Sequence, residues 1–155
     1  MMRTVDHGLF AVPIARAFEV AADVERWPSR LPHYRHVRFL SRTGEQGVVE
    51  MSANRPFGPI DWPTWWTSEM EIDRSRWEVR YRHIRGVTTG MQVVWRLTVE
   101  HGMTSVLLIH EWEGPPWGPL RRPAAEWVIG PVFVHGIASR TLAGLARYCE
   151  RSGNE

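Results

Sequence analysis

Hydrophobic and polar positions alternate along the middle of the chain, which is the pattern of strands that bury one face. Six such segments lie between residues 35 and 112, separated by turn-forming pairs such as Thr43-Gly44 and His101-Gly102. The expected strands are Arg35–Arg42, Val48–Ala53, Trp62–Ile72, Arg76–Ile84, Met91–Glu100 and Thr104–Trp112. Short turns between consecutive strands predict an antiparallel sheet with one wet face and one buried face.

A strand and two short helices are expected ahead of these segments. Thr4–Ala11 has the pattern of a short strand, and Pro13 opens an apolar stripe at helical spacing that runs to Ala22. Asp23 is suited to cap a further short turn. We expect Trp27-Pro28 and Leu31-Pro32 to end that turn, because the residue before a proline avoids helical backbone.

A helix near the C-terminus is the element that can cover the buried face. It is expected from about Gly130-Pro131 to Glu150, with a stripe made of Val134, Ala138, Leu142, Leu145 and Cys149. The inward strips of the sheet would be Trp77, Val79, Tyr81 and His83, followed by Met91, Val93, Trp95, Leu97 and Val99. The pattern predicts an α+β fold: a seven-stranded curved antiparallel sheet around one long C-terminal helix, with two short helices after the first strand.

Composition narrows the function classes. The 155 residues suit one domain, and all 19 basic residues are arginine, so imine chemistry on a lysine is excluded. A net charge of +2 does not indicate a dedicated DNA-binding protein. Cys149 is the only cysteine, which excludes an internal disulfide and favours a reducing compartment. With neither a secretory signal nor a membrane-spanning segment evident in the sequence, we expect a cytoplasmic protein.

Three stretches of sequence resemble a known family. They are AADVERWPSRLPHYRHV, GMQVVWRLTVE and GPVFVHGIASRTLAGL, set in the order strand, two short helices, meander and long helix. Together they resemble the START-like superfamily with the helix-grip fold, most closely its polyketide cyclase/dehydrase and coenzyme-Q-binding branch. The resemblance covers nearly the whole chain, so residues 1–155 are expected to form a single START-like domain. The family includes enzymes, lipid carriers and a ribosome-association toxin, so this fold does not define the chemistry.

The resemblance implies a cavity between the sheet and the C-terminal helix that holds an elongated apolar or aromatic ligand. A closed core built from the same residues is the alternative. A cavity of several hundred cubic ångströms would distinguish the first from the second. The residues expected to line such a cavity are Trp66, Ser68, Met70, Trp77, Tyr81, His83, Met91, Trp95, Leu108, Val134 and Ala138.

Two residues are candidates for proton transfer. Tyr34 matches the position of a cavity tyrosine in polyketide aromatase/cyclases, and the alternative is a structural tyrosine behind the second short helix. His110 on the last strand has an imidazole whose ordinary pKa near 6.5 suits acid–base work, and the alternative is a structural histidine that pairs with a neighbouring strand or with Tyr81. Those cyclases direct an arginine into the cavity, whereas the matching position here is Met70, or Glu69 or Glu71 if the alignment shifts by one residue. None of these carries a positive charge, which argues against aromatase chemistry. His83 is a weaker candidate, nearer a strand end and expected to be more hydrated.

Other features have two interpretations each. His135 faces either the cavity mouth or solvent, and residues 113–123 form either a lid or a plug. His33 and His36 have no third residue at the spacing of metal ligands, so no metal site is expected. The predicted chemistry needs no cofactor.

The leading hypothesis is a protein that binds a polyketide, quinone or lipid, either as a cyclase-like enzyme or as a carrier. The alternative is a ribosome- or protein-interaction module that uses the arginine-rich outer face of the sheet. Further partners left open are a transient membrane contact and a homodimer.

Overall fold

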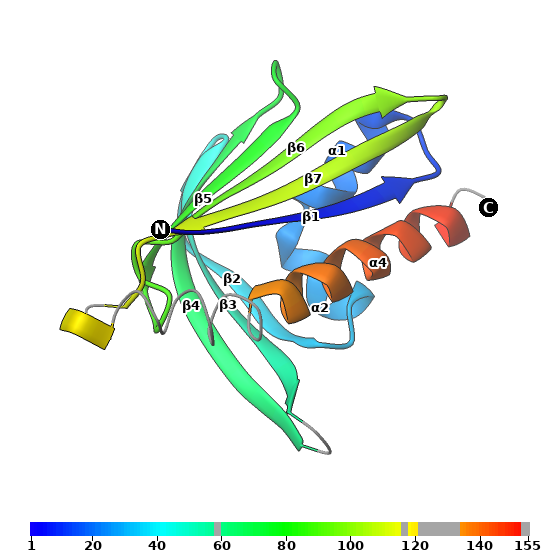
Figure 1. The fold of residues 1–155 in the computed structure, drawn as a ribbon. Coiled ribbons are helices and arrows are strands. Elements are labelled where there is room, and N and C mark those ends of the chain that lie inside the picture. The colour runs from blue at the N-terminus through cyan, green and yellow to red at the C-terminus, as the bar shows by residue number, and fades with distance from the viewer. Residues whose placement is uncertain (58–59, 116–117, 121–133, 153–155) are drawn as a thin grey trace.

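The protein is a seven-stranded antiparallel sheet curled around one long helix (Figure 1). The computed structural model describes residues 1–57, 60–115, 118–120 and 134–152. The strands are β1 (Met2–Phe10), β2 (Tyr34–Thr43), β3 (Gln46–Phe57), β4 (Ile60–Asp73), β5 (Glu78–Arg85), β6 (Gln92–Glu100) and β7 (Met103–Trp112). The helices are α1 (Ile14–Ala22), η1 (Val24–Arg26), α2 (Trp27–Arg30), η2 (Gly118–Leu120) and α4 (His135–Ser152).

The strands lie side by side in the order β1-β7-β6-β5-β4-β3-β2. Apart from β1 and β7, strands that are adjacent in the sheet are also consecutive in the sequence. Short turns make this meander. His101 and Gly102 between β6 and β7 both have positive φ, of 48° and 77°, as a two-residue hairpin turn requires. Between β4 and β5, the Asp73 carboxylate accepts hydrogen bonds from the Ser75 hydroxyl and the Arg76 amide. The predicted fold class is confirmed.

Three local expectations were wrong. Pro28 does not end the helical turn, because Trp27–Arg30 forms α2 with the proline in its first turn, where no amide hydrogen is needed; the helix ends instead before the extended Leu31 and Pro32, the second pair expected to stop it. Trp77 lies in the turn before β5 with a φ of 55°, and its ring packs edge-on against Phe18. Val99, which continues the inward parity of β6, is 67% exposed because it lies near the end of the strand.

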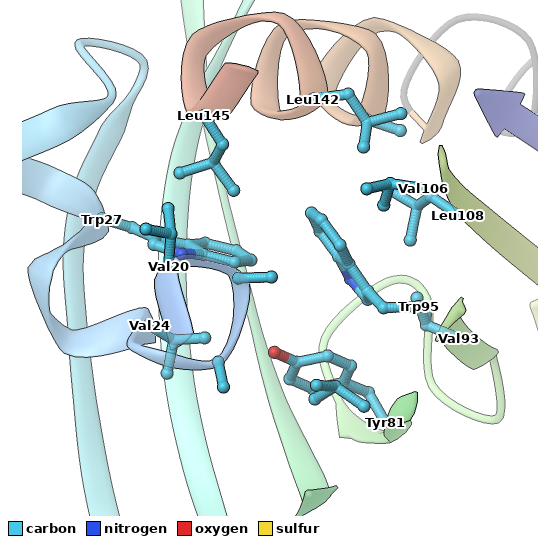
Figure 2. Packing of buried hydrophobic residues seen from close by; sticks show 14 of the residues in the cluster. Val20, Val24, Trp27, Tyr81, Val93, Trp95, Val106, Leu108, Leu142 and Leu145 are labelled. Atoms are coloured by element: carbon cyan, nitrogen blue, oxygen red, sulfur yellow. The ribbon is translucent and has the colours of Figure 1, made fainter. Parts of the chain in front are cut away.

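The long helix α4 lies along the concave side of the sheet, and α1 and α2 close the same side farther along (Figure 1). The described part of α4 buries the predicted stripe of Ala138, Leu142, Leu145 and Cys149. In Figure 2, Leu142 and Leu145 face Trp27 from α2 and Trp95 from β6 across the interior. The main hydrophobic cluster therefore lies between the helices and the inward side chains of the sheet.

Close contact between α4 and the segment after α2 depends on a glycine. A Cβ atom at Gly144 would lie 2.3 Å from Cδ2 of the buried Leu31. We expect Gly144→Ala to lower the free energy of unfolding by about 1–3 kcal/mol, because the packed leucine has little room to move. Gly136→Ala is the control in the same helix, since nothing lies within 4 Å of the added atom. Urea denaturation measures both, and equal stability of the two variants would contradict this account.

Candidate functional site

A cavity of about 80 Å³ lies between the concave face of the sheet and α4. Its described walls come from α2, strands β2 to β7, the β5–β6 loop and α4. They are Trp27, Tyr34, Met51, Thr64, Trp66, Tyr81, His83, Val87, Thr88, Met91, Val93, Trp95, Leu108, His110, Val134, Ile137, Ala138 and Thr141. The volume is smaller than the several hundred cubic ångströms expected for an elongated ligand, and holds only a few water molecules. Large aromatic side chains fill much of the interior.

Most of the residues predicted from sequence lie on this wall, and three do not. Both Tyr34 and His110 line the cavity, together with Trp66, Tyr81, His83, Met91, Trp95, Leu108, Val134 and Ala138. Ser68 and Met70 are buried on β4 but lie outside the lining, and Met70 pairs with Tyr81 across the sheet. Trp77 is separated from the cavity by its place in the β4–β5 turn.

Tyr34 is held by a polar cluster behind the wall. The buried His33 ring is hydrogen-bonded through Nε2 to Oγ1 of Thr141, 3.0 Å away, and this hydroxyl in turn donates to the carbonyl of Ile137. Burial raises the pKa of the Tyr34 phenol well above its usual range, although a hydrogen bond with Thr141 opposes the rise. The Tyr34 ring packs edge-on against Trp27 at 5.2 Å between centroids. Tyr34 is therefore a neutral, positioned phenol at neutral pH.

Three buried polar atoms of the wall have no hydrogen-bond partner among the described residues. They are the Tyr81 hydroxyl, Nδ1 of His110 and the indole Nε1 of Trp27. Tyr81 directs its hydroxyl toward the interior of the cluster (Figure 2). Burial lowers the pKa of His110 to about 4 and raises that of Tyr81 well above its ordinary value. Both groups are neutral at pH 7, so the ordinary histidine pKa that motivated proton transfer does not apply to His110.

His83 is buried rather than hydrated, contrary to expectation. Its Nδ1 lies 2.6 Å from the Thr88 hydroxyl in the β5–β6 loop, and its ring stacks on Trp66 with centroids 5.8 Å apart. Burial lowers the pKa of His83 to about 3, with a smaller contribution from His110. His83 therefore joins the loop at residues 86–90 to the cavity wall.

Several lining residues had not been anticipated. Ile137 and Thr141 lie on the same helical stripe as Val134 and Ala138, so the 3.6-residue period could have identified them. Trp27 lies in α2, which was not expected to be helical at this position. The loop residues Val87 and Thr88 carry no periodic signal at all.

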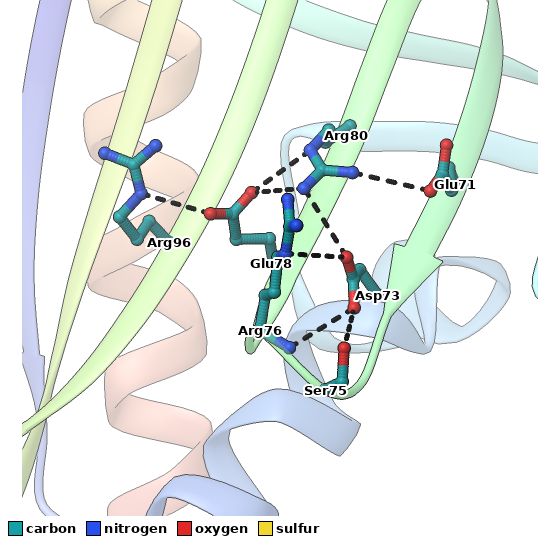
Figure 3. A network of polar contacts seen from close by, with 7 residues as sticks. All are labelled: Glu71, Asp73, Ser75, Arg76, Glu78, Arg80 and Arg96. Carbon is teal, nitrogen blue, oxygen red and sulfur yellow. Dashed lines mark hydrogen bonds and ion pairs between the residues drawn. The ribbon is translucent and has the colours of Figure 1, made fainter.

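The arginines on the outer sheet face are paired with carboxylates (Figure 3). Arg80 contacts Glu71, Asp73 and Glu78. Arg96 contacts Glu78, and Arg82 contacts Glu69. Exposed pairs of this kind contribute little to stability, but they leave this face with charges of both signs.

The remaining candidates are placed as follows. His135 lies at the start of α4, and its exposed ring pairs through Nδ1 with the buried carboxylate of Asp6 on β1. Burial raises the pKa of Asp6, and the ion pair with His135 opposes that rise.

In the part of the chain that the structure describes, histidine, cysteine and acidic side chains form no cluster suited to a metal ion. None of the described helices is long and apolar enough to cross a membrane. Much of the segment expected to be a lid or plug, residues 113–123, lies outside the described residues.

The sheet, the gripping helix and the interior cavity define a helix-grip protein of the START-like class. Residues 10–134 match the sequence model of the family described as polyketide cyclase/dehydrase and lipid transport. The chain belongs to this family. A comparison with curated proteins finds no match.

Solved structures with the same fold include TTHA0849 from Thermus thermophilus, at 16% identity and a TM-score of 0.79 over 97% of this chain and 99% of that one. The Zhui aromatase/cyclase from Streptomyces sp. R1128 has 21% identity and a TM-score of 0.77 over 97% of this chain and 94% of that one. The di-domain ARO/CYC StfQ from the steffimycin biosynthetic pathway has 15% identity and a TM-score of 0.78, covering 99% of this chain and 52% of that protein. These similarities establish the fold.

Proposed function

We propose that the cavity binds a neutral hydrophobic or aromatic molecule that carries a carbonyl or hydroxyl oxygen, such as a polyketide, a quinone or a polar lipid. The observation that carries this proposal is the presence on the wall of polar atoms that no described residue pairs with, above all the Tyr81 hydroxyl and Nδ1 of His110. An unpaired buried polar group costs about 1–3 kcal/mol. A ligand oxygen that pairs with either group would remove part of this cost.

The charge state of the wall supports a neutral ligand. Neither an arginine nor a carboxylate occurs among the described residues that line the cavity. With a pKa of about 4, His110 is deprotonated and only weakly basic at pH 7. The raised pKa of Tyr34 likewise favours a neutral hydrogen-bonding phenol. We therefore assign these groups to ligand binding and orientation, and place binding ahead of acid–base catalysis.

The size of the cavity adds a requirement. An elongated molecule does not fit in about 80 Å³, so indole side chains must move when it enters. Trp27 and Trp95, with ring centroids 5.6 Å apart, occupy the centre of the interior. Binding should therefore change tryptophan fluorescence.

Native mass spectrometry of protein freshly purified from its own host, followed by extraction, tests the proposal directly. A co-purified quinone, polyketide or fatty acid would support the proposal and identify the chemical class of the ligand. Protein that carries no ligand and shows no fluorescence change with neutral aromatic ketones such as 1-tetralone would contradict it.

Tyr81→Phe separates stability from binding. Because the Tyr81 hydroxyl is buried without a partner among the described residues, its removal is expected to raise the free energy of unfolding by about 1 kcal/mol. The same change should weaken 1-tetralone binding about 5- to 10-fold, since a hydrogen bond to the ketone is lost. Fluorescence titration and thermal unfolding measure the two effects. Tyr148→Phe on α4, outside the described lining, is the control, and the proposal fails if both variants bind the ketone like the parent protein.

A further inference from the structure

A groove of about 570 Å³ runs along one flank of α4, outside the cavity. The opposite wall is the segment Leu31–His33 between α2 and β2, together with Asn54 of β3. The backbone amide of Asn54 donates to the carbonyl of His33 at 2.6 Å, which fixes this wall to the sheet. The lining of this α4 groove is Leu31, Pro32, His33, Asn54, Ser139, Arg140, Ala143, Gly144 and Arg147.

The charge of the α4 groove differs from that of the outer sheet face. Arg140 and Arg147 are exposed, and neither forms an ion pair or hydrogen bond with any residue that the structure describes. None of the described lining residues is a carboxylate. On the sheet, by contrast, Arg80, Arg82 and Arg96 each contact a glutamate. Among the described residues, therefore, no carboxylate pairs with the two arginines of the groove.

The spacing of the two arginines suits one anionic group. Arg147 is seven positions after Arg140, so the two arginines lie on the same face of α4. Two helical turns, or about 10 Å along the helix axis, lie between them. Two guanidinium groups at this spacing can close on a phosphate from both ends, and each can donate two hydrogen bonds to it. Ala143 beside them has only a small, exposed side chain, and the side-chain amide of Asn54 on the opposite wall can donate a further hydrogen bond.

We propose that the α4 groove binds a phosphate group, carried either by a soluble small molecule or by a lipid headgroup. This site is distinct from the cavity, and its test does not depend on the ligand proposed there. The two sites nevertheless share a wall. His33 lines the groove and is hydrogen-bonded to Thr141, which lines the cavity.

His33 also provides a local reporter of occupancy. Burial lowers the pKa of His33 to about 4, and the positive charge of Arg140 contributes to the shift. A phosphate beside Arg140 would offset that charge, so the ring resonances of His33 should move on binding. His7, exposed on β1 and bonded to Ser105, lies elsewhere and should not respond.

The experiment is calorimetric titration of the full chain with inorganic pyrophosphate at low ionic strength, with the histidine ring resonances followed by NMR. We expect saturable binding at one site, and at least a tenfold weaker affinity in Arg140→Gln/Arg147→Gln. The control is Arg3→Gln/Arg82→Gln, which removes the same charge from two exposed arginines that each pair with a glutamate. This control should bind pyrophosphate like the parent protein.

Co-sedimentation with phosphatidylcholine vesicles, with and without phosphatidic acid, distinguishes the two sources of phosphate. Saturable pyrophosphate binding that needs Arg140 and Arg147 supports a soluble phosphorylated ligand. Binding only to vesicles with phosphatidic acid, lost in the same double variant, supports a lipid headgroup. Absence of both kinds of binding, or equal loss in the control, would overturn the proposal.

Discussion

Acidification from pH 7 toward pH 4 is expected to unfold the protein, because three histidines of the interior, the buried His33 and His83 and the half-buried His110, are neutral in the folded state. The pKa is lowered from 6.5 to about 4 for His33 and His110, and to about 3 for His83, with burial as the largest cause in each case. Unfolded chains bind these protons near pH 6.5, so the unfolded state gains them first. The contribution of these neutral histidines to the free energy of unfolding is complete above pH 6.5, and it is lost as the pH falls toward their folded-state pKa values.

The expected loss is large compared with the stability of a domain. Within this window each histidine contributes about 1.4 kcal/mol per pH unit, and three together contribute about 4 kcal/mol per unit. Summed from pH 6.5 down to the folded-state values, the three contributions reach about 12 kcal/mol, which is comparable with the whole stability of an ordinary domain, about 5–15 kcal/mol.

Urea denaturation at several pH values measures this slope. His110→Gln keeps a polar side chain of similar size but cannot titrate, so the slope between pH 6.5 and 5 should fall by about one third. His7→Gln makes the same substitution at an exposed ring on β1 and is the control. A slope that is the same in all three proteins would show that burial of His110 does not control its protonation.

Most of the fold could be predicted because alternation and helical period are local properties of the sequence. The strand β6 was expected at 91–100 and occurs at Gln92–Glu100, since an apolar residue occupies every second position from Met91 to Val99. Alternation does not reveal where a strand begins to turn. The parity of β5 continues through Trp77, but its positive φ places that residue in the turn and against Phe18.

The site was less predictable than the fold. The alternation of side chains along a strand identifies which residues face inward, but not which other residues pack over each of them. Ser68 and Trp66 have the same parity on β4, yet only Trp66 lines the cavity. Which inward residue meets a void depends on how α2 and α4 pack over the sheet. The lowered pKa of His110 was similarly hidden, because it comes from desolvation in a cavity whose walls belong to several strands and to α4.

Trp95→Ala is expected to cause the largest single loss of stability at the cavity. Trp95 is buried on β6 and packs near Trp27, so the substitution removes an indole from the centre of the interior. Truncation of a buried tryptophan costs about 3–5 kcal/mol. Trp65→Ala on the same sheet is the control, because its side chain is 55% exposed on the outward side and should tolerate the change.

The same substitution should improve binding of small apolar molecules. In the parent protein a ligand must displace indole groups from a cavity of about 80 Å³, whereas Trp95→Ala provides that space in advance. The neutral fluorophore N-phenyl-1-naphthylamine should bind the variant saturably and more tightly than the parent. It should also raise the midpoint of thermal unfolding, since a ligand that binds only the folded state stabilises it. A variant that loses stability without gaining saturable binding would indicate that the interior serves packing alone, and would count against the cavity as the functional site.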